Sequence, residues 1–89
     1  MTMHGHEKSY IEFRLMPNPT ERKTSAWEVL AKSDGCILGR ISWFGRWRKY
    51  CFWPADDAVF EENCLRHIAD FGEALTREQR AKNERRNAS

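Results

Sequence analysis

Apolar and polar residues alternate along three stretches of the chain, and this alternation predicts β-strands. The first stretch covers residues 10–15, where apolar and charged residues fall on opposite sides: Ile11, Phe13 and Leu15 against Glu12 and Arg14. The residues that follow, MPNPTERKT, include two prolines and an asparagine, which favour a loop. We therefore expect a first strand that ends before this loop.

The segment AWEVLAKSDGCILGRISWF contains two β-type runs around the sequence SDG. A three-residue loop of Ser33, Asp34 and Gly35 would give Gly35 the left-handed conformation that such loops need. The register that follows gives these pairs: Lys32 with Cys36, Leu30 with Leu38, Glu28 with Arg40, and Trp27 with Ile41. One face then carries an opposite-charge pair. The other face carries apolar side chains: Trp27, Val29, Ile37 and Ile41.

A second tight turn is predicted at Gly45 and Arg46. It gives these pairs: Trp43 with Arg48, Ile41 with Tyr50, and Gly39 with Phe52. Tyr50 and Phe52 then share the face of Trp27 and Ile41, and Gly39 leaves room for the Phe52 ring. Pro54 is expected to end the strand.

After residue 57 the apolar residues recur at spacings of three and four, which predicts a helix: Phe60, Cys64, Ile68, Phe71 and Leu75. Asp56 or Asp57 is the expected cap, and Glu61 and Glu62 suit the positive end of the helix dipole. Beyond Leu75 the chain is polar on every face, so residues 76–89 are predicted to form a frayed tail. Residues 1–9 are predicted to be a flexible arm.

These elements together predict an α+β fold, an antiparallel meander of three to four strands with one C-terminal helix packed on one face. Residues 10–75 would form a single domain, since a chain of 89 residues has room for one core. The side chains expected to be buried are Trp27, Ile41, Tyr50, Phe52, Leu65, Ile68 and Phe71.

Composition narrows the class of protein. Apolar residues make up 40% of the chain and charged residues 31%, which excludes a wholly disordered chain. No apolar run approaches the roughly 20 residues of a bilayer helix, so no membrane partner is expected. The start, MTMHGHEKSY, lacks an apolar signal region, and three cysteines form an odd set. We expect a cytoplasmic protein with free thiols.

The net charge of +2 conceals a strong segregation of charge along the chain. Residues 1–38 balance at zero, and residues 39–54 carry four basic residues and no acid. Residues 55–73 carry six acids against one arginine, and the remainder has a charge of +3. Such blocks predict separate charged surfaces.

The stretch ISWFGRWRKYCFWP, residues 41–54, holds most of the aromatic side chains that the predicted register leaves on the face away from the helix. Leu30 and Leu38 are expected to join this face. Its candidate binding residues are Arg40, Phe44, Arg46, Trp47, Lys49 and Trp53. Tryptophan can stack bases while arginine and lysine meet phosphates, and the same residue types anchor protein interfaces. A third possibility is that the protein itself or a homodimer partner covers the face.

The pattern of reactive residues favours no enzymatic site. Cys64 and His67 have a spacing at which metal ligands converge, but no second pair has zinc-site spacing. Cys51 near Arg40 has no histidine beside it in the predicted register. His4 and His6 lie in the predicted arm. No phosphate-binding glycine motif occurs, so we expect no enzyme, no metal and no cofactor.

Three segments carry a resemblance to a known family: TSAWEV from Thr24, LGRISWFGRWRKYCFWP from Leu38, and CLRHIADF from Cys64. Together they resemble a family of short, mostly uncharacterised open reading frames of phages, prophages and bacterial genomes, over about residues 24–71. The resemblance implies an accessory protein of mobile elements that interferes with host machinery. It supplies no catalytic or binding residues.

The leading expectation is a small non-enzymatic binding protein whose partner is a nucleic acid or a nucleic-acid-handling complex. One alternative is an inhibitor of a host defence protein, of the anti-CRISPR kind, that docks through the Trp/Arg face or the acidic helix. The other is a structural homo-oligomer. Continuity of basic charge from Arg40 through Lys49 to the tail would favour the first, and a solvent-facing acidic stripe would favour the second.

Overall fold

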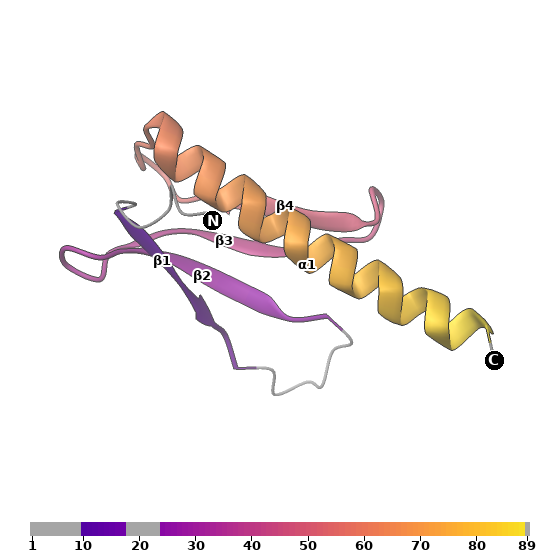
Figure 1. Cartoon of the computed structure of the whole chain (residues 1–89). Coiled ribbons are helices and arrows are strands. Elements are labelled where there is room, and N and C mark those ends of the chain that lie inside the picture. The colour runs from indigo at the N-terminus through magenta and orange to yellow at the C-terminus, as the bar shows by residue number, and fades with distance from the viewer. Residues whose placement is uncertain (1–9, 18–23, 89) are drawn as a thin grey trace.

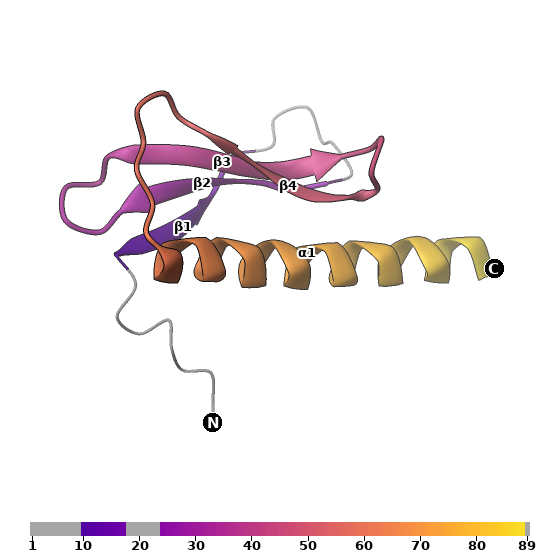
Figure 2. The same ribbon diagram turned by 90° about the horizontal axis from the view of Figure 1, so that it is seen from above.

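A computed structural model describes residues 10–17 and 24–88. Its elements in chain order are β1 (Ile11–Leu15), β2 (Ala26–Ala31), β3 (Ile37–Phe44), β4 (Lys49–Pro54) and α1 (Glu62–Ala88). Each strand pairs antiparallel with the next, so the described strands form one sheet in the order β1-β2-β3-β4. The helix lies across one face of this sheet (Figures 1 and 2). The predicted α+β meander with one C-terminal helix is confirmed. The predicted arm, residues 1–9, lies outside the described residues.

The β2–β3 hairpin follows the predicted register in only part of its length. Trp27 pairs with Ile41 and Glu28 with Arg40, as predicted, but the register shifts between Val29 and Leu30. Leu30 therefore pairs with Ile37 rather than Leu38. A slip of one residue moves side chains to the opposite face. Ile37 was predicted to face the helix and Leu38 to face away from it, and both predictions are wrong. Ile37 is half exposed, and Leu38 packs against the core.

The loop that closes this hairpin is one residue longer than predicted. The Ala31 N–H donates to the Cys36 carbonyl, so Lys32 joins the loop instead of pairing with Cys36. The Gly35 N–H donates a hydrogen bond to the Ala31 carbonyl, and Gly35 has a φ of 75°. The left-handed conformation predicted for Gly35 is confirmed.

The β3–β4 register is two residues away from the predicted one. Ile41 pairs with Phe52 and Trp43 with Tyr50, so residues 45–48 form a four-residue loop in place of the predicted turn at Gly45 and Arg46. A shift of two preserves the alternation of faces, and Tyr50 and Phe52 still point toward α1. The Phe52 ring also occupies the space above Gly39, where an added Cβ would lie 2.5 Å from it.

The core lies between α1 and the sheet. Its buried side chains are Ile11, Val29, Ile41, Tyr50, Cys64 and Ile68. Around them pack partly buried rings: Phe71 stacks on Phe13 with centroids 4.0 Å apart and meets Trp27 edge to face at 5.0 Å. The buried Tyr50 hydroxyl lies 3.1 Å from the Ser25 hydroxyl, so its polar end is satisfied.

Of the predicted core, Ile41, Tyr50 and Ile68 are buried, and Trp27, Phe52 and Phe71 are partly buried. Leu65 is the exception, with half of its surface exposed. It follows Cys64 on the helix, and a step of one residue turns a side chain about 100° around the axis. Because Cys64 faces the sheet, Leu65 points away from it.

The helix differs from the prediction at both ends. Its cap is Glu61, whose carboxylate accepts the Cys64 N–H at 2.6 Å, rather than Asp56 or Asp57. Asp57 instead takes a positive φ of 64° in the preceding turn. At the other end α1 continues to Ala88, so the predicted boundary at Leu75 is wrong.

The helix continues past Leu75 because polar residues there have partners. Thr76 and Gln79 are buried, although neither is apolar. The Tyr50 N–H donates to Thr76 Oγ1 at 2.9 Å, and Arg80 Nε donates to the Arg48 carbonyl at 3.1 Å. These two hydrogen bonds hold α1 against β4 and the 45–48 loop.

Candidate binding face

The sheet has one face that α1 does not cover. No helix or strand of the described residues lies over it, as Figure 2 shows. Strand alternation directs Arg40 and Phe44 of β3 and Trp53 of β4 to this side, because Ile41, Tyr50 and Phe52 point toward α1. Lys49, the first residue of the edge strand β4, borders this side and also lines the groove against α1. With Arg46 and Trp47 of the 45–48 loop, they make up what we call the outer face.

Three aromatic rings meet on the outer face and form the aromatic cluster. Phe44 lies between two tryptophans, with its centroid 5.0 Å from Trp47 and 6.0 Å from Trp53, both edge to face. Trp47 is 62% exposed and Trp53 is 36% exposed. In an edge-to-face contact the edge of one ring meets the face of the other, so each contact covers at most one face of a ring. The cluster therefore presents two indole surfaces held by one half-buried phenylalanine.

Basic side chains surround this cluster. The Arg40 guanidinium carbon lies 5.5 Å from the Trp53 ring centroid, in a cation–π arrangement. Lys49 is the cross-strand partner of Phe44, and Arg46 and Arg48 are exposed in the loop beside Trp47. Residues 39–54 contain no acid, so the local potential of this hairpin is positive.

A polar row crosses the same face toward β1. The register aligns Arg14, Glu28, Arg40 and Trp53 on neighbouring strands. Arg14 donates from Nε, at 3.0 Å, and from Nη2 to the same Glu28 oxygen, Oε1. The ion pair with Arg14 offsets the negative charge of Glu28, the acidic residue of this row. The outer face thus changes from polar at β1 to aromatic and basic at β4.

All six predicted binding residues belong to the outer face or its loop, and ring contacts join Phe44, Trp47 and Trp53 directly. Leu30 and Leu38 do not contribute as predicted, since Leu30 is buried and Leu38 packs on the core. Sequence reasoning missed Ile37, which the β2–β3 register shift turns outward. It also placed Arg48 in a strand, whereas the structure has this residue exposed in the 45–48 loop. The basic block of residues 39–54 already included Arg48.

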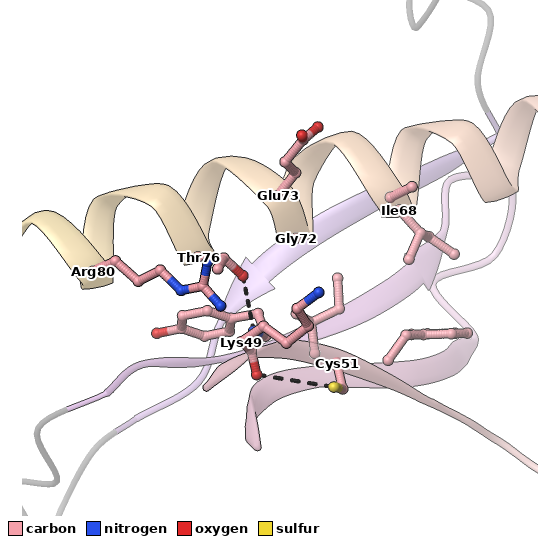
Figure 3. A pocket seen from close by; sticks show the side chains of 11 residues that line it. Lys49, Cys51, Ile68, Gly72, Glu73, Thr76 and Arg80 are labelled. Carbon is pink, nitrogen blue, oxygen red and sulfur yellow. Dashed lines mark hydrogen bonds between the residues drawn. The ribbon is translucent and has the colours of Figure 1, made fainter. Parts of the chain in front are cut away.

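A second groove runs between β4 and α1, lined by side chains that include Lys49, Thr76 and Arg80 (Figure 3). The Cys51 sulfur points away from the helix toward the Lys49 carbonyl, 3.9 Å away. None of the lining residues is a histidine. A thiol without a neighbouring base lacks the arrangement of a nucleophilic site.

The same groove borders the free edge of the sheet. A strand edge offers unpaired N–H groups to another chain. Here the Tyr50 N–H is already bound to Thr76, and Pro54 has no N–H to offer. Both ends of β4 are therefore poor places for strand addition.

The residues considered for metal binding lie apart from the outer face. Cys64 is buried in the core and His67 meets the Phe13 ring edge to face at 4.8 Å. Among the described residues, no group of three or more His, Cys, Asp or Glu is placed to hold a metal. His4 and His6 lie outside this part of the chain. No helix within it is long and apolar enough to span a membrane.

Comparison with known proteins gives one informative relative. The chain is 32% identical, over 71 residues, to the "Uncharacterized 9.3 kDa protein" of Acholeplasma phage L2. The match covers 80% of this chain and 90% of the phage protein. The chain belongs to the family of this phage protein. No family model matches the chain, and no solved structure matches it either.

Membership in this phage family defines the chain as a small protein of phage type. The aligned length, 71 residues, exceeds the span from β1 to β4, so the match extends beyond the sheet alone. The name of the phage protein gives no partner. The functional argument therefore depends on the surfaces of this chain.

Proposed function

We propose that this member of the phage family is a non-enzymatic binding protein whose ligand is a nucleic acid, held on the outer face. The observation that carries the proposal is the aromatic cluster, in which Phe44 contacts an exposed Trp47 and a partly exposed Trp53. Bases stack on such surfaces whatever their identity, with a contribution of roughly 1 to 3 kcal/mol per base.

The surrounding charge supports the same ligand. Stacked bases bring their phosphates alongside the rings, where Arg40, Arg46 and Lys49 are available. An aromatic platform combined with a basic groove is the general arrangement for single strands. Duplex DNA hides its base faces, so the outer face suits a single strand better than a double helix.

The test is a titration of single- and double-stranded oligonucleotides by fluorescence anisotropy, at about 50 and 200 mM salt. We expect single strands to bind more tightly than duplexes at low salt, and affinity to fall log-linearly as salt increases, because bound phosphates release counterions. No binding of either form at the lower salt concentration would remove the proposal and leave the outer face as a protein contact.

A second candidate, an inhibitor that docks on a host defence protein, is favoured by a different surface. Val59 is 87% exposed between two acidic pairs, Asp56–Asp57 and Glu61–Glu62. An exposed apolar residue with surrounding acids suits a basic protein partner. Capture of a host protein that survives nuclease treatment and is lost with Val59→Asp would favour this candidate. Capture lost on nuclease treatment would favour the nucleic acid.

The third alternative is a structural homo-oligomer that covers the aromatic cluster. Light scattering after gel filtration measures it directly. A stable dimer that Trp47→Ala converts to a monomer would favour this alternative over a ligand-binding face.

A further inference from the structure

We infer that one end of the outer face selects guanine in the bound single strand, an inference that rests on the proposed function. The place is the Trp53 groove, the hollow on the outer face lined by Met16, Glu28, Ile37, Arg40 and Trp53. It combines an aromatic surface, apolar walls, one acidic and one basic side chain. These are the components of a pocket for a single base.

The shape of the groove comes from the register shift in β2–β3. Because the shift turns Ile37 outward, its half-exposed side chain forms a wall of the groove instead of packing in the core. Trp53 lies two strands from Glu28 and provides the stacking surface. Arg40 stands between them, with its guanidinium carbon 5.5 Å from the indole centroid. Because Arg40 lies over this ring, a base that stacks on Trp53 takes the place of the guanidinium, and Arg40 and Glu28 then flank the edges of the base.

The polar groups of the groove are available to a ligand. Both Arg14 donors go to Glu28 Oε1, and within the described residues Glu28 Oε2 has no hydrogen-bond donor. Arg40 is the cross-strand partner of Glu28, yet no ion pair joins the two in the described part of the chain. The groove therefore holds a fixed acceptor and a set of guanidinium donors next to Trp53.

Guanine fits both of these groups. It carries two adjacent acceptors, O6 and N7, which arginine binds in a bidentate way. Next to O6 it carries N1–H and N2–H donors, which a carboxylate accepts. Adenine has a donor, N6, where guanine has O6, so it opposes the Arg40 donors. Cytosine offers the carboxylate one amino group and a smaller ring to stack, so its match is weaker.

The test compares oligothymidylate and oligouridylate of about 12 nucleotides with the same strands carrying one central G, A or C. Both DNA and RNA arms are used because guanine occurs in both. We expect one guanine to lower Kd by about tenfold relative to the unsubstituted strand, in the range of a good bidentate contact. Adenine and cytosine should change Kd less than about threefold.

Glu28→Gln is the deciding variant, because it keeps the shape and one acceptor but loses the carboxylate. The guanine preference should fall to about twofold or less. The affinity for plain oligothymidylate should change no more than it does in a control variant that loses the same charge elsewhere. The matched control is Glu12→Gln, which removes the same charge from an exposed residue of β1, outside the Trp53 groove. Competition of the unmodified protein with guanosine and adenosine monophosphates repeats the test without a substitution.

The outcomes separate the inference from the function beneath it. Tight binding with equal affinity for all four bases, or a preference for another base, would overturn guanine selection and leave the nucleic-acid proposal standing. A guanine preference that Glu28→Gln leaves intact would also overturn it. No binding of any oligonucleotide would overturn both.

Discussion

The two faces of this sheet are both rich in aromatic rings, but the rings serve different purposes. On the inner face they pack against α1, as Phe13 and Trp27 do against Phe71. On the outer face Phe44, Trp47 and Trp53 contact one another, and no helix or strand among the described residues lies over them. Aromatic content by itself therefore does not identify a binding surface. The outer face differs in that no helix or strand of the described residues covers its rings.

The strongest test of the inner face is Phe71→Ala. The substitution removes the ring that stacks on Phe13 at 4.0 Å and meets Trp27 at 5.0 Å. We expect a loss of about 3 to 5 kcal/mol in the free energy of unfolding, a large part of a small domain's stability. Urea denaturation followed by circular dichroism measures it. Leu65→Ala, on the exposed side of the same helix, is the control and should cost less than about 1 kcal/mol.

Gly39→Ala tests the packing of the sheet itself. An added Cβ would lie 2.5 Å from the Phe52 ring and 2.7 Å from the Trp53 carbonyl oxygen. Because backbone cannot move aside as a flexible side chain can, we expect a loss of about 1 to 3 kcal/mol. The control is Gly45→Ala, whose new Cβ would have no contact closer than 4.0 Å. Equal melting temperatures for the two variants would show that Phe52 does not pack over Gly39.

Trp47→Ala should show the contrasting behaviour of the outer face. Trp47 is 62% exposed, so its removal should change stability by less than about 1 kcal/mol. If it stacks a base, single-strand affinity should fall by roughly 1 to 3 kcal/mol, or about 5- to 150-fold. Tyr10→Ala removes a ring of similar exposure at the β1 end and serves as the control. A large drop in melting temperature for Trp47→Ala would contradict the division between the two faces.

The smallest expected effect is at the seam between β4 and α1. Thr76→Val keeps the shape of the side chain but removes the hydroxyl that accepts the Tyr50 N–H at 2.9 Å. We expect a loss of about 1 kcal/mol, since the groove in Figure 3 admits water to the freed N–H. Hydrogen exchange at the Tyr50 amide should accelerate. Unchanged exchange would mean that Thr76 does not protect this edge.

The sequence by itself determined which side chains share a face. Alternation with a period of two directs Ile41, Tyr50 and Phe52 inward and Phe44 and Trp53 outward, and this holds even though the predicted β3–β4 register was two residues off. The left-handed Gly35 and the basic block of residues 39–54 are also local properties. Each depends only on neighbouring residues, so Arg40, Phe44 and Trp53 share a face as predicted.

Tertiary structure decided the features that depend on contacts between distant segments. The shift between Val29 and Leu30 exchanges the roles of Ile37 and Leu38, and no local pattern marks it. The length of α1 depends on Thr76 and Arg80, polar residues whose partners, Tyr50 and Arg48, lie about 30 positions earlier in the chain. Register, bulges and polar helix contacts are set by which groups meet across space, because a polar residue favours solvent until the fold supplies its partner.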